Sequence, residues 1–183
     1  MIDTAGRSQL LAAAREAVSA ASRGLPLPEP PVLDGCGVDP GAGVFVTLSS
    51  PDGLRGCIGL FKGLRSLGET VVRMAAAAAT EDPRFPPVKP SEVDGLSIDI
   101  SVLGPMTESE PGLVVPGVHG VLVRSGSRSG TLLPQVATEQ GWSREELLSH
   151  ACLKAGLPPG LWRSGPLQVF TYTAEVFGDR QKG

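Results

Sequence analysis

The amino-acid sequence predicts an α+β fold in which helices pack on an antiparallel or mixed β-sheet. Two observations carry this prediction. Segments with apolar residues at alternate positions outnumber those with apolar residues at helical spacing, and most neighbouring segments are joined by tight turns. The chain also has 24 glycines and 17 prolines among its 183 residues, which suits short elements separated by many turns. This length fits one domain.

An amphipathic helix is predicted near the N-terminal end, over residues 7–22. Apolar residues recur there at helical spacing, namely Leu10, Leu11, Ala14, Ala17, Val18 and Ala21. Residues 24–31 contain four prolines. No helix can cross such a run, because proline lacks a backbone N–H and clashes with the preceding turn. We therefore expect an extended connector over residues 24–35.

A β-hairpin is predicted after this connector. Residues 44–48 form an apolar run rich in β-branched side chains, and residues 54–61 form the returning strand. Between them lies Ser50-Pro51-Asp52-Gly53, in which proline presets the turn conformation and glycine tolerates its tight end. The two strands should therefore pair directly.

Ser66 and Glu69 have the spacing of a capping box, so a second helix is predicted over residues 67–80. A proline-locked loop should follow at residues 82–88. Residues 96–103 alternate between apolar and polar side chains and predict a strand. The remaining predicted elements are strands at 119–124 and 131–133 around a turn at 125–130, helices at 134–140 and 143–156, and a last strand at 167–177.

Composition excludes several classes of function. The formal net charge of -3 and an aromatic content of 4% do not suit a nucleic-acid-binding protein. Neither a signal peptide nor a basic amphipathic helix for a membrane surface is visible. Three widely spaced cysteines do not suggest a disulfide framework, so we expect a reduced, cytoplasmic protein. Motifs for zinc, iron–sulfur clusters, nicotinamide, flavin or a phosphate-binding loop are absent, so neither a metal nor a cofactor is expected.

Cys57 is the residue that most suggests chemistry. Side chains alternate on a strand, so Arg55 should share the face of Cys57, with the two Cα atoms roughly 7 Å apart. A fixed positive charge near a thiol favours the nucleophilic thiolate. Gly56 and Gly59 flank the cysteine, and glycine in a strand often marks close approach of a ligand or backbone. The alternative is a small, buried, unreactive cysteine.

Two further positions are candidates for a site. His119 is one of only two histidines, and it could act as a base or orient a nucleophile; the alternative is an ordinary turn histidine. Arg84 lies on the proline-locked loop, where a rigid guanidinium would suit a carboxylate or phosphate. The alternative there is a structural clamp, with Phe85 in the core and Arg84 bonded to Asp82 or a backbone carbonyl.

Polar residues on two other elements could line a groove. Gln135 and Glu139 are four residues apart on one predicted helix and share a face. Asp99 lies on the polar side of its predicted strand. All three could equally belong to a solvated surface. Cys152, by contrast, lies on the apolar side of its helix and should be a core residue.

Seven blocks of this sequence, in the same order, resemble the AMMECR domain family, whose bacterial and archaeal members are called AmmeMemoRadiSam system protein A. The resemblance extends from about residue 10 to residue 177. The blocks are Leu54-Arg55-Gly56-Cys57-Ile58-Gly59, Asp82-Pro83-Arg84-Phe85-Pro86-Pro87-Val88, Ser101-Val102-Leu103, His119-Gly120-Val121, Leu132-Leu133-Pro134-Gln135-Val136-Ala137, Gly141-Trp142 and Cys152-Leu153-Lys154-Ala155-Gly156-Leu157.

The resemblance implies a single domain over residues 7–178, with a larger and a smaller lobe and a cleft between them. It also implies association with a Memo-type protein and a radical SAM protein, and it implies no settled reaction. The candidates that fall in matching blocks are Arg55, Cys57, Arg84, His119 and Gln135, together with Glu139. Leu60 and Gly104 depart from residues common in the family, which affects the details of any ligand.

Two hypotheses follow. The first is an enzyme that uses Cys57 as a nucleophile or covalent relay, tuned by Arg55 and His119. The second is a non-catalytic module that binds a small anionic ligand or a peptide, with Arg55 and Arg84 as its anchors.

Overall fold

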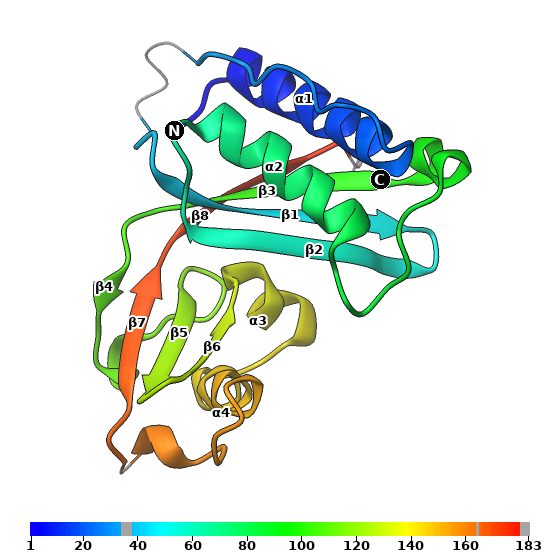
Figure 1. The fold of residues 1–183 in the computed structure, drawn as a ribbon. Helices are drawn as coiled ribbons and strands as arrows, with labels where there is room; N and C mark the ends of the chain where they lie inside the picture. Colours follow the sequence, from blue (N-terminus) through cyan, green and yellow to red (C-terminus); the bar gives the residue numbers. More distant parts are fainter. Residues whose placement is uncertain (34–37, 164, 180–183) are drawn as a thin grey trace. The chain divides into compact units, whose positions relative to one another are not determined.

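The computed structural model describes residues 1–33, 38–163 and 165–179. The chain divides into two compact units, the larger comprising Met1–Leu103 with Glu175–Gly183 and the smaller comprising Gly104–Ala174. Each unit contains helices and a four-stranded β-sheet, as Figure 1 shows. The predicted α+β fold is therefore confirmed, with two sheets where one was expected. The cleft that the family resemblance implies stays a prediction.

Four strands in the order β2-β1-β3-β8 form the sheet of the larger unit. The strand bounds are Ala42–Ser50 for β1, Gly53–Lys62 for β2, Ser97–Leu103 for β3 and Ala174–Gly178 for β8. β1 pairs antiparallel with β2 on one side and with β3 on the other, so the predicted hairpin is confirmed. Helices α1 (Thr4–Ser22) and α2 (Leu67–Thr80) lie side by side on one face of this sheet (Figure 1).

The alternation of side chains on β1 shows which face the helices cover. Val44, Val46 and Leu48 are fully buried and belong to one apolar core with the inward residues of α1 and α2. Phe45 and Thr47 point to the opposite face, because successive side chains of a strand alternate, and both stay partly exposed. The larger unit therefore has one helix-covered face and one face without helices of its own.

A capping residue directly precedes each helix of this unit. The Asp3 carboxylate accepts a hydrogen bond from Gly6 N at 2.8 Å, and α1 begins at Thr4 rather than at the predicted residue 7. The Ser66 hydroxyl accepts from Glu69 N at 3.1 Å, so α2 begins where its capping pattern predicted.

The smaller unit has a sheet in the order β4-β7-β5-β6. Its elements are β4 (Thr107–Glu108), β5 (Gly120–Ser125), β6 (Arg128–Leu132), α3 (Pro134–Gln140), α4 (Arg144–Lys154) and β7 (Gln168–Tyr172). Val121, Val123 and Val169 pack with Leu147 and Leu148 in a second apolar core. Both helices of this unit were predicted from their first residues, Pro134 in α3 and the Ser143 cap of α4.

The last predicted strand, over residues 167–177, is wrong as a single strand. It breaks at Thr173 into β7 and β8, which belong to different sheets. Alternation alone cannot show such a change of sheet, since the pattern continues across the break. The turn predicted at residues 125–130 is also too long, because Ser125 pairs with Arg128 and only Gly126 and Ser127 connect the strands.

Short 3₁₀ helices, which were not predicted from the sequence, also occur among the described residues, at Pro90–Gly95, Pro111–Leu113 and Leu161–Arg163. In the described part of the connector, residues 25–33 form neither helix nor strand. No helix within the described ranges is long and apolar enough to cross a membrane.

Candidate functional site

Cys57 lies near the middle of β2 and is a partly exposed residue. The preceding residue, Gly56, is the one that packs under α2, since a side chain there would collide with the carbonyl oxygen of Ala78. Cys57 therefore points to the helix-free face of the sheet rather than into the core beneath α2. Cys152 differs, since it is fully buried in the second core, as predicted, and burial raises the pKa of its thiol.

Thr47 is the direct partner of the Cys57 side chain. It lies opposite Cys57 in the β1–β2 pairing, and its hydroxyl donates a hydrogen bond to Cys57 Sγ at 3.3 Å. The Cys57 backbone N–H points away from β1, which identifies a non-hydrogen-bonded pair, in which side chains approach closely. On the other side of Thr47, β3 places Asp99 in register with it. Cys57, Thr47 and Asp99 thus form one row across three strands, here called the thiol row.

Asp99 closes the thiol row against β8. A side chain at Gly178 would collide with the Asp99 carboxylate, so only glycine leaves room for Asp99 in this position. Asp99 is partly exposed on the same helix-free face as Thr47. Asp99 therefore lies in the same row as Cys57, and its role in a site stays a prediction.

Asp82 and Arg84 fix the backbone of Cys57 from the outer edge of the sheet. β2 is an edge strand, and the Asp82 carboxylate accepts the outward N–H of Cys57 at 2.8 Å. The same carboxylate accepts from Arg84 N at 3.1 Å, from Nε at 2.9 Å and from Nη2 at 2.7 Å. These contacts occupy backbone positions at which another strand could otherwise pair.

The Asp82 carboxylate is almost completely buried, with 3% of its side chain exposed. Hydrogen bonds from Arg84 hold the pKa of Asp82 well below its usual range, and the Cys57 N–H contributes in the same direction. Arg84 is 54% exposed, and its pKa is raised chiefly by Asp82 and to a smaller extent by the charge of Cys57. The guanidinium also reaches the Cys57 backbone directly, because Nη2 donates a long hydrogen bond to the Cys57 carbonyl at 3.5 Å.

Arg55 was expected beside Cys57, and its guanidinium bonds elsewhere. A β-bulge interrupts the pairing here, because Leu48 pairs with Gly56 whereas the next residue of β1 pairs with Leu54. Arg55 Nε donates to Glu92 at 2.9 Å. Its Nη1 donates to the Pro86 carbonyl at 2.9 Å and its Nη2 to the Pro87 carbonyl at 3.3 Å. These contacts hold the proline-rich loop, and tuning of the thiol by Arg55 gains no support from them.

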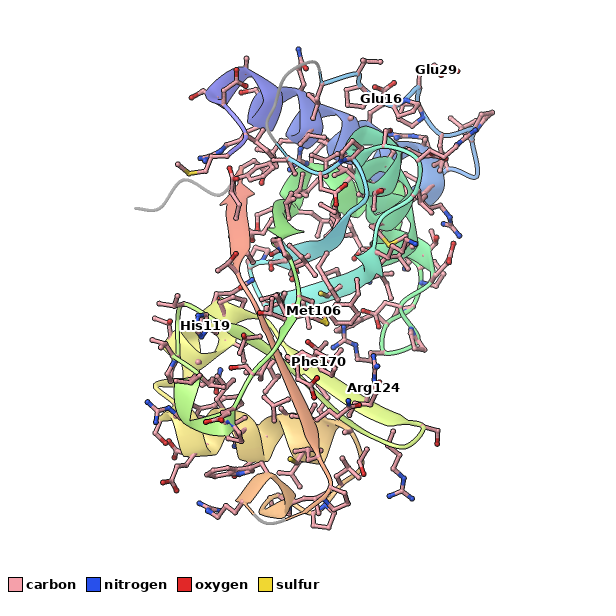
Figure 2. All side chains as sticks on the ribbon, turned by 90° about the vertical axis from the view of Figure 1, so that its left-hand side faces the viewer. Glu16, Glu29, Met106, His119, Arg124 and Phe170 are labelled. Atoms are coloured by element: carbon pink, nitrogen blue, oxygen red, sulfur yellow. The ribbon has the colours of Figure 1, made fainter. Side chains whose placement is uncertain are left out.

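The other candidates lie in the smaller unit. His119 lies immediately before β5, where its Nδ1 accepts a hydrogen bond from Val115 N at 3.2 Å (Figure 2). The neutral ring therefore carries its proton on Nε2. Gln135 and Glu139 lie on α3, the first partly buried and the second exposed. A meeting of any of them with Cys57 stays a prediction.

Two members of the site were missed from the sequence. Thr47 had a signal, since it is a polar residue at an alternate position of an apolar strand, but its partner depends on a register that the sequence does not show. Asp82 was noted only as a partner for Arg84, whereas the structure also bonds it to Cys57 N. Cys36 lies outside the described residues.

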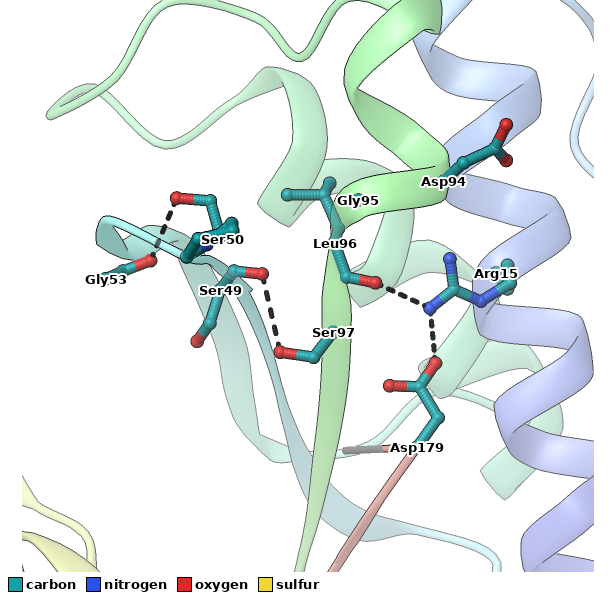
Figure 3. A pocket seen from close by; sticks show the side chains of 10 residues that line it. Arg15, Ser49, Ser50, Gly53, Asp94, Gly95, Leu96, Ser97 and Asp179 are labelled. Carbon is teal, nitrogen blue, oxygen red and sulfur yellow. Dashed lines mark hydrogen bonds and ion pairs between the residues drawn. The ribbon is translucent and has the colours of Figure 1, made fainter. Parts of the chain in front are cut away.

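A pocket of about 670 Å³ lies in another part of the larger unit, near the turn between β1 and β2 (Figure 3). Its lining includes the carboxylates of Asp94 and Asp179. Arg15 also lines it, but the guanidinium already donates to Leu96 O at 2.8 Å and to Asp179. No candidate predicted from the sequence lines this pocket. Within the described ranges, no group of three or more His, Cys, Asp or Glu side chains is placed to hold a metal ion.

Comparison with known proteins gives consistent matches across the chain. A family model described as AMMECR1 matches residues 11–177. A protein of Methanopyrus kandleri is 48% identical over 149 residues, which are 76% of this chain and 72% of that protein. A protein of Pyrococcus horikoshii is 43% identical over 146 residues, 74% of this chain and 71% of that protein.

A solved structure agrees with the fold. The crystal structure of an uncharacterized protein from Pyrococcus horikoshii matches with a TM-score of 0.85 and 38% sequence identity, covering 93% of this chain and 90% of that chain. The resemblance based on seven sequence blocks is thereby confirmed. The chain belongs to the AMMECR1 family.

Proposed function

We propose that this protein is a thiol-dependent enzyme in which Cys57 is the nucleophile. The observation that carries the proposal is the thiol row, in which Cys57, a partly exposed residue on the helix-free face, has its Sγ 3.3 Å from the Thr47 hydroxyl. A hydroxyl that donates to sulfur stabilises the thiolate relative to the thiol, and the thiolate is the nucleophilic form.

The backbone contacts support the same function. A nucleophile must be held in place while its substrate approaches, and the Cys57 N–H is bonded to the buried Asp82 carboxylate at 2.8 Å. The side chain is fixed from one side by Thr47 and the main chain from the other by Asp82. Both supports belong to the larger unit.

The reaction class is transfer of a group through sulfur. The Cys57 thiol first loses its proton to solvent. Sγ then donates an electron pair to an electrophilic carbon of the substrate, and a carbon–sulfur bond forms as the bond from that carbon to the leaving group breaks. The leaving group takes the electron pair of the bond that breaks, and a proton from solvent. Water or a second substrate then removes the bound fragment and regenerates the thiol.

Covalent capture tests this function. The native protein is incubated with a small-molecule extract, quenched in acid and digested, and the mass of the Cys57 peptide is compared with that of the Cys57→Ser variant. An added mass on Cys57 that water or an added thiol later removes is expected. Cys152 is the internal control, because it is fully buried and should stay unmodified. A Cys57 peptide that never gains mass would contradict the proposal.

We also propose that the protein acts in the cytoplasm with a Memo-type protein and a radical SAM protein. Membership of the AMMECR1 family supports this part. Mixing the purified proteins and testing for a complex by size-exclusion chromatography tests it. A complex is expected for wild type and for Cys57→Ser alike, because the substitution only replaces the sulfur atom by oxygen. Absence of any complex with either protein would count against it.

A non-catalytic binding module is the second candidate, and one observation favours it. Arg84 is held by the buried Asp82 carboxylate while 54% of its own side chain remains exposed, as suits a residue that presents a charge to a ligand. The two functions differ in their dependence on sulfur. A binding module still binds its ligand when Cys57 is replaced by serine. In the wild-type protein, its Cys57 peptide never gains mass.

A further inference from the structure

We propose that Arg84 is the anchor for an oxyanion group of the substrate, a carboxylate or a phosphate, beside Cys57. This inference rests on the proposed function for the role of Cys57, and it deepens that function by naming the class of substrate. Arg84 can bind such a group only through guanidinium N–H groups that have no acceptor within the protein.

A guanidinium offers two pairs of parallel N–H groups to planar acceptors. The side edge consists of Nε and Nη2, and the end edge consists of Nη1 and Nη2. Asp82 occupies the side edge of Arg84, with Nε to Oδ1 at 2.9 Å and Nη2 to Oδ2 at 2.7 Å. Nη2 also donates a hydrogen bond to the Cys57 carbonyl, at the limiting distance of 3.5 Å. Among the residues that the structure describes, Nη1 has no hydrogen-bond partner. The Nη1 side of the end edge is therefore open to an acceptor.

Two other arginines show what an occupied end edge looks like. Arg73 uses Nη1 and Nη2 to bind Glu81, at 2.7 and 3.2 Å. Arg55 uses the same two nitrogens for the carbonyls of the proline-rich loop. These side chains are committed to the fold, whereas Arg84 receives its main support through the side edge and can offer Nη1 to an acceptor from outside.

Burial of Asp82 makes Arg84 a prepared site rather than a mobile surface charge. Only 3% of the Asp82 side chain is exposed, and Cys57 N and Arg84 N also hold its carboxylate. A side chain held in this way has already lost most of its rotamer freedom, so an incoming anion need not order it. Exposure of 54% of the Arg84 side chain allows that anion to reach it.

The position of Arg84 relates the anchor to the proposed nucleophile. One carboxylate, Asp82, holds both the Arg84 guanidinium and the Cys57 backbone, and Arg84 Nη2 lies 3.5 Å from the Cys57 carbonyl oxygen. A substrate whose oxyanion occupies the end edge of Arg84 would therefore have its next atoms close to Cys57. The expected substrate carries an electrophilic carbon near a carboxylate or phosphate group.

Two alkylating reagents of similar size but different charge test this inference. Iodoacetate carries a carboxylate, whereas iodoacetamide is neutral, and their rates at Cys57 are measured by mass spectrometry. Arg84→Gln should lower the ratio of the iodoacetate rate to the iodoacetamide rate by about fivefold, the upper value for a partly exposed charge pair. Arg65→Gln is the matched control, because it removes the same charge from a side chain that is 90% exposed, and the ratio should not change.

A second measurement does not depend on the thiol. In the Cys57→Ser variant with ¹⁵N-labelled arginine, the Arg84 Nε–H signal should move on titration with inorganic phosphate, with acetate, or with both, and the stronger response identifies the preferred oxyanion. Arg84→Lys lacks the guanidinium Nε–H and therefore identifies the signal, and the titration needs no Arg84→Gln protein. If the Arg84 signal shifts on titration but Cys57 of the wild-type protein never gains mass, Arg84 is still the anion anchor and the proposed enzyme is contradicted. An unmoved signal together with an unchanged rate ratio would overturn the anchor.

Discussion

Replacement of Asp82 by asparagine should show how much of the site depends on one buried carboxylate. Asparagine has nearly the same shape but no charge, and its amide group donates where the carboxylate accepted. The Asp82 carboxylate accepts from Cys57 N, Arg84 N, Arg84 Nε and Arg84 Nη2. The single amide oxygen of asparagine cannot serve this set, so at least one buried N–H loses its partner.

The cost follows from the environment of each group. A buried hydrogen-bonding group left without its partner costs about 1–3 kcal/mol, and more where a charge is involved. Arg84 is 54% exposed, so water can solvate most of its freed charge, and the larger penalty for a fully buried ion pair does not apply. We therefore expect Asp82→Asn to lower the free energy of unfolding by about 2–3 kcal/mol.

Urea denaturation followed by circular dichroism measures this loss, and hydrogen exchange at the Cys57 amide reports it locally. The neighbouring variant Glu81→Gln is the matched control, because its pair with Arg73 is about half-exposed on both sides and should contribute less than about 1 kcal/mol. The Cys57 amide should exchange faster in Asp82→Asn alone. Equal stability of the two variants, with unchanged exchange at Cys57, would refute this account of the edge of β2.

The other predictions concern Thr47, acid stability and glycine. Thr47→Val should slow iodoacetamide modification of Cys57 by about tenfold, because the thiolate loses a hydrogen-bond donor, and Thr47→Ser should restore the rate. The pKa of Asp82 is lower in the folded protein than in the unfolded chain. The difference in free energy of unfolding between wild type and Asp82→Asn, measured by urea denaturation, should therefore be complete above about pH 5 and decrease as the pH falls below about 4. Gly56→Ala should destabilise by more than about 2 kcal/mol through its clash with α2, whereas Gly95→Ala, which meets open space, should change the free energy of unfolding by less than about 0.5 kcal/mol.

The elements that the sequence predicted well have local signals at their ends. Helix α2 has Ser66 as its cap, and the helix ends before the proline-rich loop that begins with Asp82 and Pro83. The hairpin of β1 and β2 follows from a four-residue turn containing Pro51 and Gly53. The division of residues 167–177 between two sheets has no such signal at Thr173, because pairing partners far along the chain determine it.

The candidate site shows the same division between local and distant information. Cys57 and Arg84 could be selected from their own neighbours in the chain, and the structure places them on one buried carboxylate. Thr47 could not be assigned to Cys57 without the register of β1 and β2. Arg55 was paired with Cys57 from two-residue spacing, which implies a shared face only in a regular strand, whereas a β-bulge interrupts the pairing of β2 at that position.

Selective modification of Cys57 tests the central claim most directly. The native protein is treated with iodoacetamide at about pH 7, where only an activated thiol reacts quickly, and the peptides of Cys57 and Cys152 are compared over time by mass spectrometry. Cys57 lies partly exposed on the helix-free face beside Thr47, whereas Cys152 is fully buried, so Cys57 should be modified while Cys152 is still intact. If both cysteines resist until urea unfolds the protein, Cys57 is not the accessible nucleophile that this account requires.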